Sequence, residues 1–371
     1  MLILHNTYRA EGGEERAVRE LAALLHRHGH HAATLERASA EVSPARAARA
    51  MLGGGEDPDA VAAAVRGERA EVVHAHNLHP LFGWRALAAA RAAGARTVLH
   101  LHNFRLYCAI GVAYRERQPC HACRGRNTLP GLVHRCRGSL PEASVYAVAL
   151  ARQQPRLLEH ADRIVVLSEG HGRLLRAHGL PPERVTVLPN FVTETADASR
   201  AGSGRYGLVA GRLVEEKGFD TAVLAARAAG VPLVVAGIGP DEDRLRALAA
   251  GAEVEFVGWL SAPRLAEVRA GAGVALAPSR CEEACPYSVL DALATGVPVL
   301  ASDRGGLPDL VGPSAALPAE DTGAWTRALE SLWRDPERRA GAGEAALASA
   351  RARFGETRYL RALLEVYGCA P

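Results

Sequence analysis

The chain has 371 residues, of which 48% are hydrophobic, and a formal net charge of +3 at pH 7. This length exceeds the size at which one hydrophobic core usually divides, so about two domains are expected. The small net charge excludes binding of nucleic acid or membrane through the overall charge, so any basic binding surface must be local.

The start of the chain and its hydropathy predict a cytoplasmic protein. The apolar run after Met1 is too short for a signal peptide and has no basic residues before it. No run of about 18 consecutive apolar residues occurs, so no membrane-spanning helix is predicted. Seven cysteines in a chain without an export signal favour metal ligands or free thiols over disulfides.

Short apolar runs alternate with helical patterns along the chain, which is typical of βαβ units and a parallel sheet. A helix is predicted after the first run, because Val18, Leu21 and Leu25 recur at helical spacing. The runs expected to form strands are 2–4, 71–75, 97–102 and 164–167 in the first half, and 206–210, 233–236, 254–257, 274–277 and 297–301 in the second.

A segment with few large apolar residues separates the two series of strands. We therefore predict an N-terminal domain at 1–192, a linker at 193–205 and a C-terminal domain at 206–350. The expected fold is α/β, with two Rossmann-like, doubly wound parallel-sheet domains. Because ligands of such sheets bind beyond the carboxyl ends of the strands, the site is expected in a cleft that the domains face.

Two cations follow the first predicted strand of the C-terminal domain. Gly211 and Arg212 come directly after it, and Lys217 lies five residues further on. A diphosphate bound at the carboxyl end of this strand would need such charges to neutralise it. Gly237 starts a glycine turn after the next strand, where the backbone is able to approach a ligand closely.

Two carboxylates border a later loop of the same domain. Glu283 lies in the polar loop 278–287, and Asp291 lies in the helix predicted after it. Both side chains are expected to border one pocket, where the helix N-terminus is a suitable phosphate site. Gly305 and Gly306 form a glycine pair after a further strand.

The order of these motifs resembles the C-terminal half of retaining glycosyltransferases of family 4, which have the GT-B fold. The resemblance implies that Arg212 and Lys217 bind the donor diphosphate and that Glu283 lies beside the donor sugar. Asp291 stands where the family usually has Glu and would hold the ribose hydroxyls. The matching segments are Gly211-Arg212 to Lys217-Gly218, the acidic pair Glu283 and Asp291, Gly296-Val297-Pro298-Val299, and Gly305-Gly306.

The N-terminal half also resembles this family. Gly12 and Gly13 match its Gly-Gly loop, whose backbone approaches the donor phosphates or the acceptor. Residues two apart in a strand share a face, so His74 and His76 should point together, as should His100 and His102. By the resemblance, His102 lies near the donor anomeric carbon, where it positions groups and stabilises charge. Residues 351–371 resemble the family's last helix, which returns to the first domain.

The resemblance implies transfer of a sugar, with retention, from a nucleotide diphosphate sugar to an acceptor. UDP is expected as the commonest donor nucleotide of the family, and the acceptor is a glycan, a lipid-linked sugar or a secondary metabolite. No carboxylate pair has the spacing of retaining hydrolases, so a covalent intermediate has little support. The resemblance implies front-face displacement, in which no cofactor takes part in catalysis. The alternatives are a GT-B nucleotide-sugar epimerase and a zinc-stabilised, non-catalytic binding module.

An insertion at 104–140 is rich in cysteine and arginine. Four thiolates at its spacing suit a tetrahedral structural Zn²⁺, and a set of reduced, partly buried cysteines is an equal alternative. The insertion has seven arginines and one acidic residue, a surface that would suit an anionic lipid at a membrane. A solvated insertion is favoured, because no apolar stripe accompanies the charges, and no nucleic-acid partner is expected. The four cysteines are Cys108, Cys120, Cys123 and Cys136.

Overall fold

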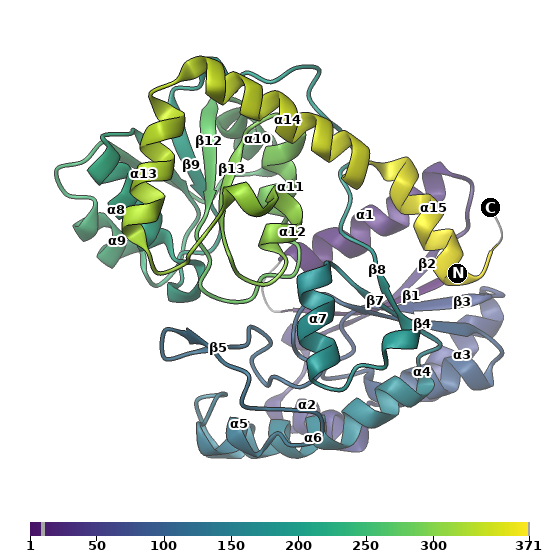
Figure 1. Cartoon of the computed structure of the whole chain (residues 1–371). Helices are drawn as coiled ribbons and strands as arrows, with labels where there is room; N and C mark the ends of the chain where they lie inside the picture. Colours follow the sequence, from purple (N-terminus) through teal and green to yellow (C-terminus); the bar gives the residue numbers. More distant parts are fainter. Residues whose placement is uncertain (9–11, 370–371) are drawn as a thin grey trace. The chain divides into compact units, whose positions relative to one another are not determined.

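The computed structural model describes residues 1–8 and 12–369. The chain divides into two compact units, and each contains a six-stranded parallel sheet (Figure 1). Unit 1 consists of Met1–Ala113, Cys120–Leu188 and Tyr359–Pro371, and unit 2 consists of Tyr114–Pro119 and Pro189–Arg358. In the described part of the chain, no helix is both long and apolar enough to cross a bilayer.

The sheet of unit 1 has the strand order β2-β1-β3-β4-β7-β8. Strands β3 and β4 are buried almost throughout, as is usual for a parallel sheet covered on both faces. The edge strands β2 and β8 had no prediction, because they are only partly buried and carry few apolar residues in series. The strands are β1 (Leu2–Thr7), β2 (Ala33–Ala38), β3 (Val72–Ala75), β4 (Arg96–Leu101), β7 (Arg163–Val166) and β8 (Val185–Val187).

The helices of unit 1 enclose a core that is formed mainly by Leu, Val, Ala and Phe side chains. In α1, the residues Val18, Leu21 and Leu25 are buried, as their helical spacing predicted. The helices are α1 (Gly13–Arg27), α2 (Pro44–Gly53), α3 (Pro58–Gly67), α4 (Gly83–Ala92), α5 (Leu129–Val133), α6 (Leu140–His160), α7 (Glu169–Ala177) and α15 (Glu356–Tyr367), with short 3-10 turns at Ser39–Glu41 and Pro182–Arg184.

The sheet of unit 2 has the strand order β11-β10-β9-β12-β13-β14. Counted from β9, this is the 3-2-1-4-5-6 order of dinucleotide-binding domains. All the strands predicted for this half are present, and β14 is an additional edge strand of two residues. The strands are β9 (Tyr206–Ala210), β10 (Leu233–Ala236), β11 (Val254–Gly258), β12 (Ala272–Ala277), β13 (Val299–Ser302) and β14 (Ala316–Leu317), and a separate hairpin is formed by β5 (Tyr114–Arg115) and β6 (Gln118–Pro119).

Helices cover the unit 2 sheet and bury a second core, which includes Leu213, Phe219 and Trp325. The helices are α8 (Phe219–Ala229), α9 (Glu242–Leu248), α10 (Ala262–Ala270), α11 (Tyr287–Ala294), α12 (Leu307–Val311), α13 (Thr322–Trp333) and α14 (Pro336–Phe354), with 3-10 turns at Ala201–Ser203, Glu215–Lys217 and Pro313–Ala315.

The segment 193–205, which the sequence suggested as a linker, is attached to unit 2. The Ala196 amide donates to the Ala294 carbonyl at 2.9 Å, and Ser199 Oγ donates to the Gly296 carbonyl at 2.6 Å. A backbone amide and a serine hydroxyl of this segment therefore bond to the end of α11 and the turn after it. The division between the units falls earlier, between Leu188 and Pro189.

Candidate functional site

The strand order of unit 2 reverses direction between β9 and β12, which is where open α/β sheets bind ligands. The loops after these two strands contact each other. The amides of Arg280 and Cys281 both approach the Glu216 carbonyl, at 2.8 and 3.2 Å. The cations predicted after β9 and the carboxylate predicted after β12 are thus brought to one edge of the sheet.

Lys217 and Glu283 form an ion pair at this edge. Lys217 Nζ donates to Glu283 Oε1, and Ser279 Oγ donates to the same oxygen at 2.7 Å. Burial alone would lower the pKa of Lys217, but the adjacent Glu283 carboxylate raises it above its usual value. Burial likewise opposes ionisation of Glu283, yet the Lys217 charge holds the pKa of Glu283 below its usual value. Both groups are therefore charged at neutral pH.

Arg212 supplies a second cation close to this pair. Its charge acts on both Lys217 and Glu283, and its side chain is exposed. Within the described residues Arg212 has no ion pair. The loops thus present one cation that is held by a carboxylate and one that is available to an anionic ligand.

Asp291 lies on α11 and is bound by an arginine to which the sequence analysis assigned no role. Arg269 Nη2 donates to Asp291 Oδ2 at 3.2 Å, and both side chains are mostly buried. Arg269 is in the last turn of α10, 22 residues before its partner. One oxygen of Asp291 is therefore used within the protein.

Two glycines allow the strand-end loops of unit 2 to touch. Gly237 has a φ of 142°, and a Cβ there would lie 1.8 Å from the Gly211 carbonyl oxygen. Gly305 has a φ of 59°, and a Cβ there would lie 2.2 Å from the carbonyl oxygen of Glu283. The amide of Gly306 donates to that same carbonyl at 2.6 Å. The glycine pair therefore supports the backbone that carries Glu283.

Replacing Gly305 with alanine should destabilise unit 2 by about 1–3 kcal/mol and displace the Glu283 loop, because strain and a backbone clash coincide. Urea unfolding would measure the first effect, and nucleotide binding would measure the second. Gly312→Ala is the matched control, since Gly312 also has a positive φ of 84° but nothing within 4 Å of its Cβ position. Equal losses of stability in both variants, with binding retained, would contradict a role for close contact at Gly305.

A network of charged side chains lies beside the ion pair, and its members Asp220 and Arg280 are buried. Arg280 Nη2 contacts Asp220 Oδ1 at 2.7 Å, and Arg244 Nη1 contacts Asp220 Oδ2 at 3.2 Å. On the β5–β6 hairpin, Arg117 contacts Glu215 at 3.0 Å. Although burial disfavours the Asp220 carboxylate, the two arginines keep its pKa below the usual value. This network fixes the loop after β9 that carries Lys217.

Three consecutive acidic residues, Asp241, Glu242 and Asp243, follow the glycine turn after β10. In the structure, Arg244 binds both carboxylate oxygens of Asp241 at 2.6 Å, and Arg246 binds Glu242 at 2.8 Å. Arginines of α9 therefore neutralise two of the three acidic groups.

Four histidines form a stack at the carboxyl ends of β3 and β4 in unit 1. The ring centroids of His74 and His76 lie 4.6 Å apart, and those of His100 and His102 lie 4.2 Å apart. The two pairs share a face as the spacing predicted, and they also stack on each other. His76 Nδ1 lies 2.8 Å from His102 Nε2, and His74 Nε2 lies 3.1 Å from His100 Nδ1. We call these four residues the histidine stack.

Burial keeps the histidine stack neutral. It lowers the pKa of His74 and of His102 to about 3, and His74, His5 and His171 add to the effect at His102. The pKa values of His76 and His100 are also well below the usual value, first because of burial and then because of neighbouring histidines. The rings therefore act as uncharged hydrogen-bonding groups at neutral pH.

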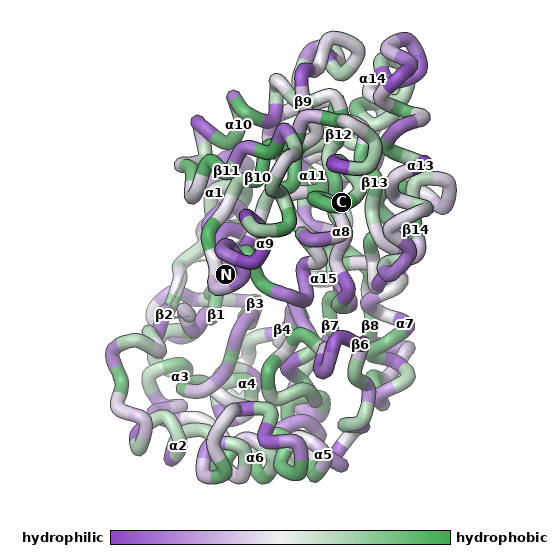
Figure 2. The backbone as a smooth tube through the Cα atoms, turned by 90° about the vertical axis from the view of Figure 1, so that its left-hand side faces the viewer, coloured by the Kyte–Doolittle hydropathy of each residue, from purple (hydrophilic) through white to green (hydrophobic). Residues whose placement is uncertain are grey.

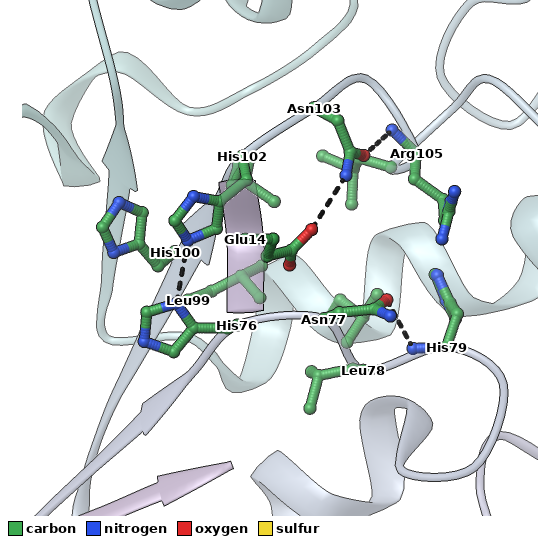
Figure 3. A pocket seen from close by; sticks show the side chains of 13 residues that line it. Glu14, His76, Asn77, Leu78, His79, Leu99, His100, His102, Asn103 and Arg105 are labelled. Atoms are coloured by element: carbon green, nitrogen blue, oxygen red, sulfur yellow. Dashed lines mark hydrogen bonds between the residues drawn. The ribbon is translucent and has the colours of Figure 1, made fainter. Parts of the chain in front are cut away.

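A cavity of about 40 Å³ lies beside the histidine stack (Figure 3). Its polar lining includes Glu14 on α1, His76 after β3, and His102, Asn103 and Arg105 after β4. Within the described chain, His76 Nε2 and Arg105 Nε are buried without a hydrogen-bond partner. The cavity therefore offers both a carboxylate and unpaired nitrogen groups to a polar molecule.

The sequence analysis assigned no role to Glu14. Tyr8 Oη donates to Glu14 Oε2 at 2.8 Å, and Asn103 Nδ2 donates to it at 3.3 Å. Burial raises the pKa of Glu14 above its usual value, even though the Tyr8 hydrogen bond opposes this. Figure 3 shows the Glu14 carboxylate directed toward Asn103.

The side chain of Glu15 holds the Gly-Gly loop, which is formed by Gly12 and Gly13. Glu15 accepts hydrogen bonds from the Gly12 amide at 2.8 Å and from the Tyr8 amide at 3.0 Å. Gly13 is the first residue of α1. The Gly12 amide is thus already bonded to Glu15, so an anion at this loop would have to compete for it.

Two family models match the chain in succession. Residues 12–190 match the glycosyl transferase 4-like domain, and residues 194–348 match the glycosyl transferases group 1. Together they include the Gly12-Gly13 loop, the Gly305-Gly306 pair and the Lys217–Glu283 ion pair. The chain belongs to the family 4-type, group 1 glycosyltransferases.

Curated relatives of this glycosyltransferase family match parts of the chain. A 2-deoxystreptamine N-acetyl-D-glucosaminyltransferase of Streptomyces fradiae is 34% identical over 212 residues, which are 50% of each chain. A GDP-mannose-dependent alpha-mannosyltransferase of Mycolicibacterium smegmatis is 36% identical over 168 residues, 42% of this chain and 44% of the relative. The chain therefore spans about half or less of the length of these relatives.

Solved structures of glycosyltransferases show the same fold. The sucrose-phosphate synthase of Thermosynechococcus elongatus has a TM-score of 0.72 at 18% identity and covers 99% of this chain and 98% of its own. HepE of Anabaena, solved with UDP, has a TM-score of 0.67 at 16% identity and covers 99% of both chains. Both likenesses are in the fold alone, and they agree with the GT-B fold predicted from the motifs.

The four cysteines that were expected as zinc ligands form no disulfide in the structure. Burial raises the pKa of Cys123 to about 11, and the charges of the other three thiols add to this, so the four lie in one neighbourhood. Their sulfur atoms do not converge, however. In the described residues, only His74, His76 and His100 have ligand atoms that all lie within 4.8 Å of one another.

The three histidines do not fit a metal ion as they lie. Their rings are stacked, so the lone pairs in the ring planes run side by side instead of meeting at one point. Both nitrogens of His74 also have partners, with Tyr367 Oη 2.7 Å from Nδ1 and His100 3.1 Å from Nε2. The chemistry of the stack is therefore that of a neutral, hydrogen-bonded group of rings.

Proposed function

We propose that the chain is a glycosyltransferase that moves a sugar from a nucleotide diphosphate sugar to an acceptor hydroxyl, with retention at the anomeric carbon. The observation that carries this proposal is the Lys217–Glu283 ion pair, with Arg212 available beside it, at the point where the unit 2 sheet reverses direction. A diphosphate is the ligand that two adjacent cations at a glycine-supported loop suit best.

Lys217 and Arg212 are proposed to bind the diphosphate and stabilise its charge as it leaves. The bond between the anomeric carbon and the phosphate oxygen breaks while the acceptor oxygen bonds to the same face of the sugar. The acceptor proton passes to the leaving phosphate oxygen, so no protein base is needed. Glu283 would then keep Lys217 in place and border the sugar, and Asp291 would contact the ribose hydroxyls.

The acceptor side of the reaction is proposed to involve the cavity of unit 1. His102 is neutral there and forms a hydrogen bond with His76. It is therefore suited to position an acceptor hydroxyl, and we do not assign it the transfer of the hydroxyl proton. Among the described residues that line the cavity, Glu14 is the only acidic one. A polyhydroxylated acceptor would find both donors and acceptors of hydrogen bonds on these walls.

The donor nucleotide is proposed to be UDP, and relatives point to the main competitor. Two of the relatives carry names for an N-acetyl-D-glucosaminyltransferase and a GDP-mannose-dependent mannosyltransferase. Thermal unfolding with saturating UDP, GDP, ADP or dTDP would identify the nucleotide, since a ligand at 100 times its dissociation constant adds about 2.7 kcal/mol. Stabilisation by GDP alone would replace UDP in the proposal, and stabilisation by none would favour the non-catalytic binding module.

Product analysis separates transfer from epimerisation, because an epimerase would use the same diphosphate groups. Incubation of the UDP-sugars and GDP-mannose with glycan, lipid-linked and aminocyclitol acceptors should yield a new glycoside and free nucleoside diphosphate. A donor that is converted into its epimer without any transfer would contradict the proposal.

Full activity in sugar transfer is expected in the presence of EDTA, since arginines already neutralise Asp241 and Glu242.

We also propose a structural zinc ion at Cys108, Cys120, Cys123 and Cys136. The four thiols lie in one neighbourhood, but Zn–S distances of about 2.3 Å require their sulfur atoms to draw closer together. One zinc per chain by elemental analysis is expected, with loss of the metal in Cys120→Ser/Cys123→Ser. Four thiols that react freely with a thiol reagent in metal-free protein would instead support the reduced-cysteine alternative.

A further inference from the structure

Unit 1 has a cluster of exposed aliphatic side chains on α5 and at the start of α6. Leu129 and Val133 are 60% and 67% exposed, and they share a face of α5 because they lie four residues apart. Leu140 and Val148 are 50% and 43% exposed and lie eight residues apart on α6. Figures 1 and 2 both draw α5 beside α6, and the two helices are in contact.

Unpaired arginines flank these aliphatic side chains. Arg124 and Arg126 precede α5, Arg135 follows it, and all three are exposed. No ion pair involves them within the described residues. Of the seven arginines between positions 117 and 158, Arg137 is paired with Glu142 and Arg117 is paired with Glu215. Unpaired positive charge at Arg124, Arg126 and Arg135 therefore lies next to the exposed aliphatic residues of α5 in the chain, and we call these arginines and the four aliphatic residues the basic–apolar surface.

The sequence analysis favoured a solvated insertion because no apolar stripe was visible among the charges. The structure shows exposed aliphatic residues among these charges, two on α5 and two on α6, and the two helices contact each other. A monomer usually buries or scatters such side chains, and a cluster that is rimmed by polar residues marks an interaction site. The combination of aliphatic tips and arginines matches the acyl boundary and the anionic headgroups of a bilayer.

We propose that the basic–apolar surface docks unit 1 onto an anionic membrane surface. Pairing with a second copy is disfavoured, because a two-fold contact would place the same arginines against each other. Nucleic acid would pair with the arginines but offers no apolar layer for Leu129 and Val133. The proposal does not depend on the reaction that the chain catalyses.

Vesicle binding would test the proposal with the full chain. Vesicles of phosphatidylcholine alone are compared with vesicles of phosphatidylcholine and phosphatidylglycerol in a ratio of about 2:1. We expect partition into the anionic vesicles only, weakened by added salt. Arg126→Gln/Arg135→Gln should lower the partition about 25-fold, at roughly fivefold per arginine. Leu129→Ser/Val133→Ser should also lower it, by about tenfold, because their side chains would no longer enter the acyl boundary.

The matched control is Arg66→Gln/Arg361→Gln, which removes the same charge from exposed positions on α3 and α15. This variant should bind like the parent chain, and unchanged unfolding temperatures would establish that all three variants fold. Equal binding by all three variants would overturn the proposal. A parent chain that ignores anionic vesicles would overturn it, and so would a dimer in solution that Leu129→Ser/Val133→Ser dissociates.

Discussion

Lowering the pH from 7 to 5 is expected to unfold unit 1 before unit 2. All 15 histidines of the chain lie in the segments that form unit 1. Seven of them have pKa values below the usual value, in each case first because burial disfavours the charged ring. The acid sensitivity of the molecule is therefore concentrated in one of its two cores.

The direction of this effect follows from proton uptake. In the unfolded chain a histidine takes up a proton below about pH 6.5, whereas His74 and His102 in the folded chain stay neutral down to about pH 3. Between these limits the unfolded state binds more protons, so the free energy of unfolding falls as the pH falls. Each such histidine costs about 1.4 kcal/mol per pH unit, and the four of the histidine stack together approach the whole stability of a domain.

Urea unfolding at several pH values, followed by pulsed hydrogen exchange and mass spectrometry, would measure each unit separately. Peptides from β3 and β4 report on unit 1, and peptides from β9 and β12 report on unit 2. His100→Asn should reduce the pH dependence of unit 1 by about one proton, while the exposed His30→Asn should leave it unchanged. Loss of both units at the same pH would contradict the concentration of this effect in unit 1.

Local sequence patterns predicted the central strands and the loops that follow them. Runs of apolar residues gave the central strands, and glycine-rich turns after them gave the loops that carry Lys217 and Glu283. The edge strand β2 was missed, because its residues alternate between partly buried and exposed and include Glu36 and Arg37. The pattern of such a strand is set by its place at the edge of the sheet, which a local window does not contain.

The partners of the site residues depend on contacts that are distant in sequence. Lys217 and Glu283 are 66 residues apart, and the resemblance to the family suggested both without their ion pair. Arg269 and Asp220 had no role assigned, since an arginine late in a helix and an aspartate early in one are ordinary helix-end residues. Arg269 becomes the partner of Asp291, and Asp220 the partner of Arg280, only when α8, α10 and α11 pack onto the sheet.

Replacing Lys217 with alanine should lower kcat/KM for sugar transfer by a factor of about 10²–10³, the loss typical of one preorganised charge or hydrogen-bond donor. The diphosphate would lose the cation that Glu283 and Ser279 hold in place. Steady-state transfer with the donor found by the nucleotide screen would measure the effect. The exposed Arg246→Ala on α9 is the matched control in unit 2 and should retain activity.

The same substitution leaves the Glu283 carboxylate buried without its cation, so a loss of stability would also reduce activity. The double variant Lys217→Ala/Glu283→Gln separates the two effects, because it removes the unpaired charge and keeps a side chain that is able to bond with Ser279. We expect it to unfold near the temperature of the parent chain and still to bind the nucleoside diphosphate weakly. Recovery of nucleotide binding in the double variant would mean that Lys217 acts only through Glu283, and that Arg212 is the cation that binds the diphosphate.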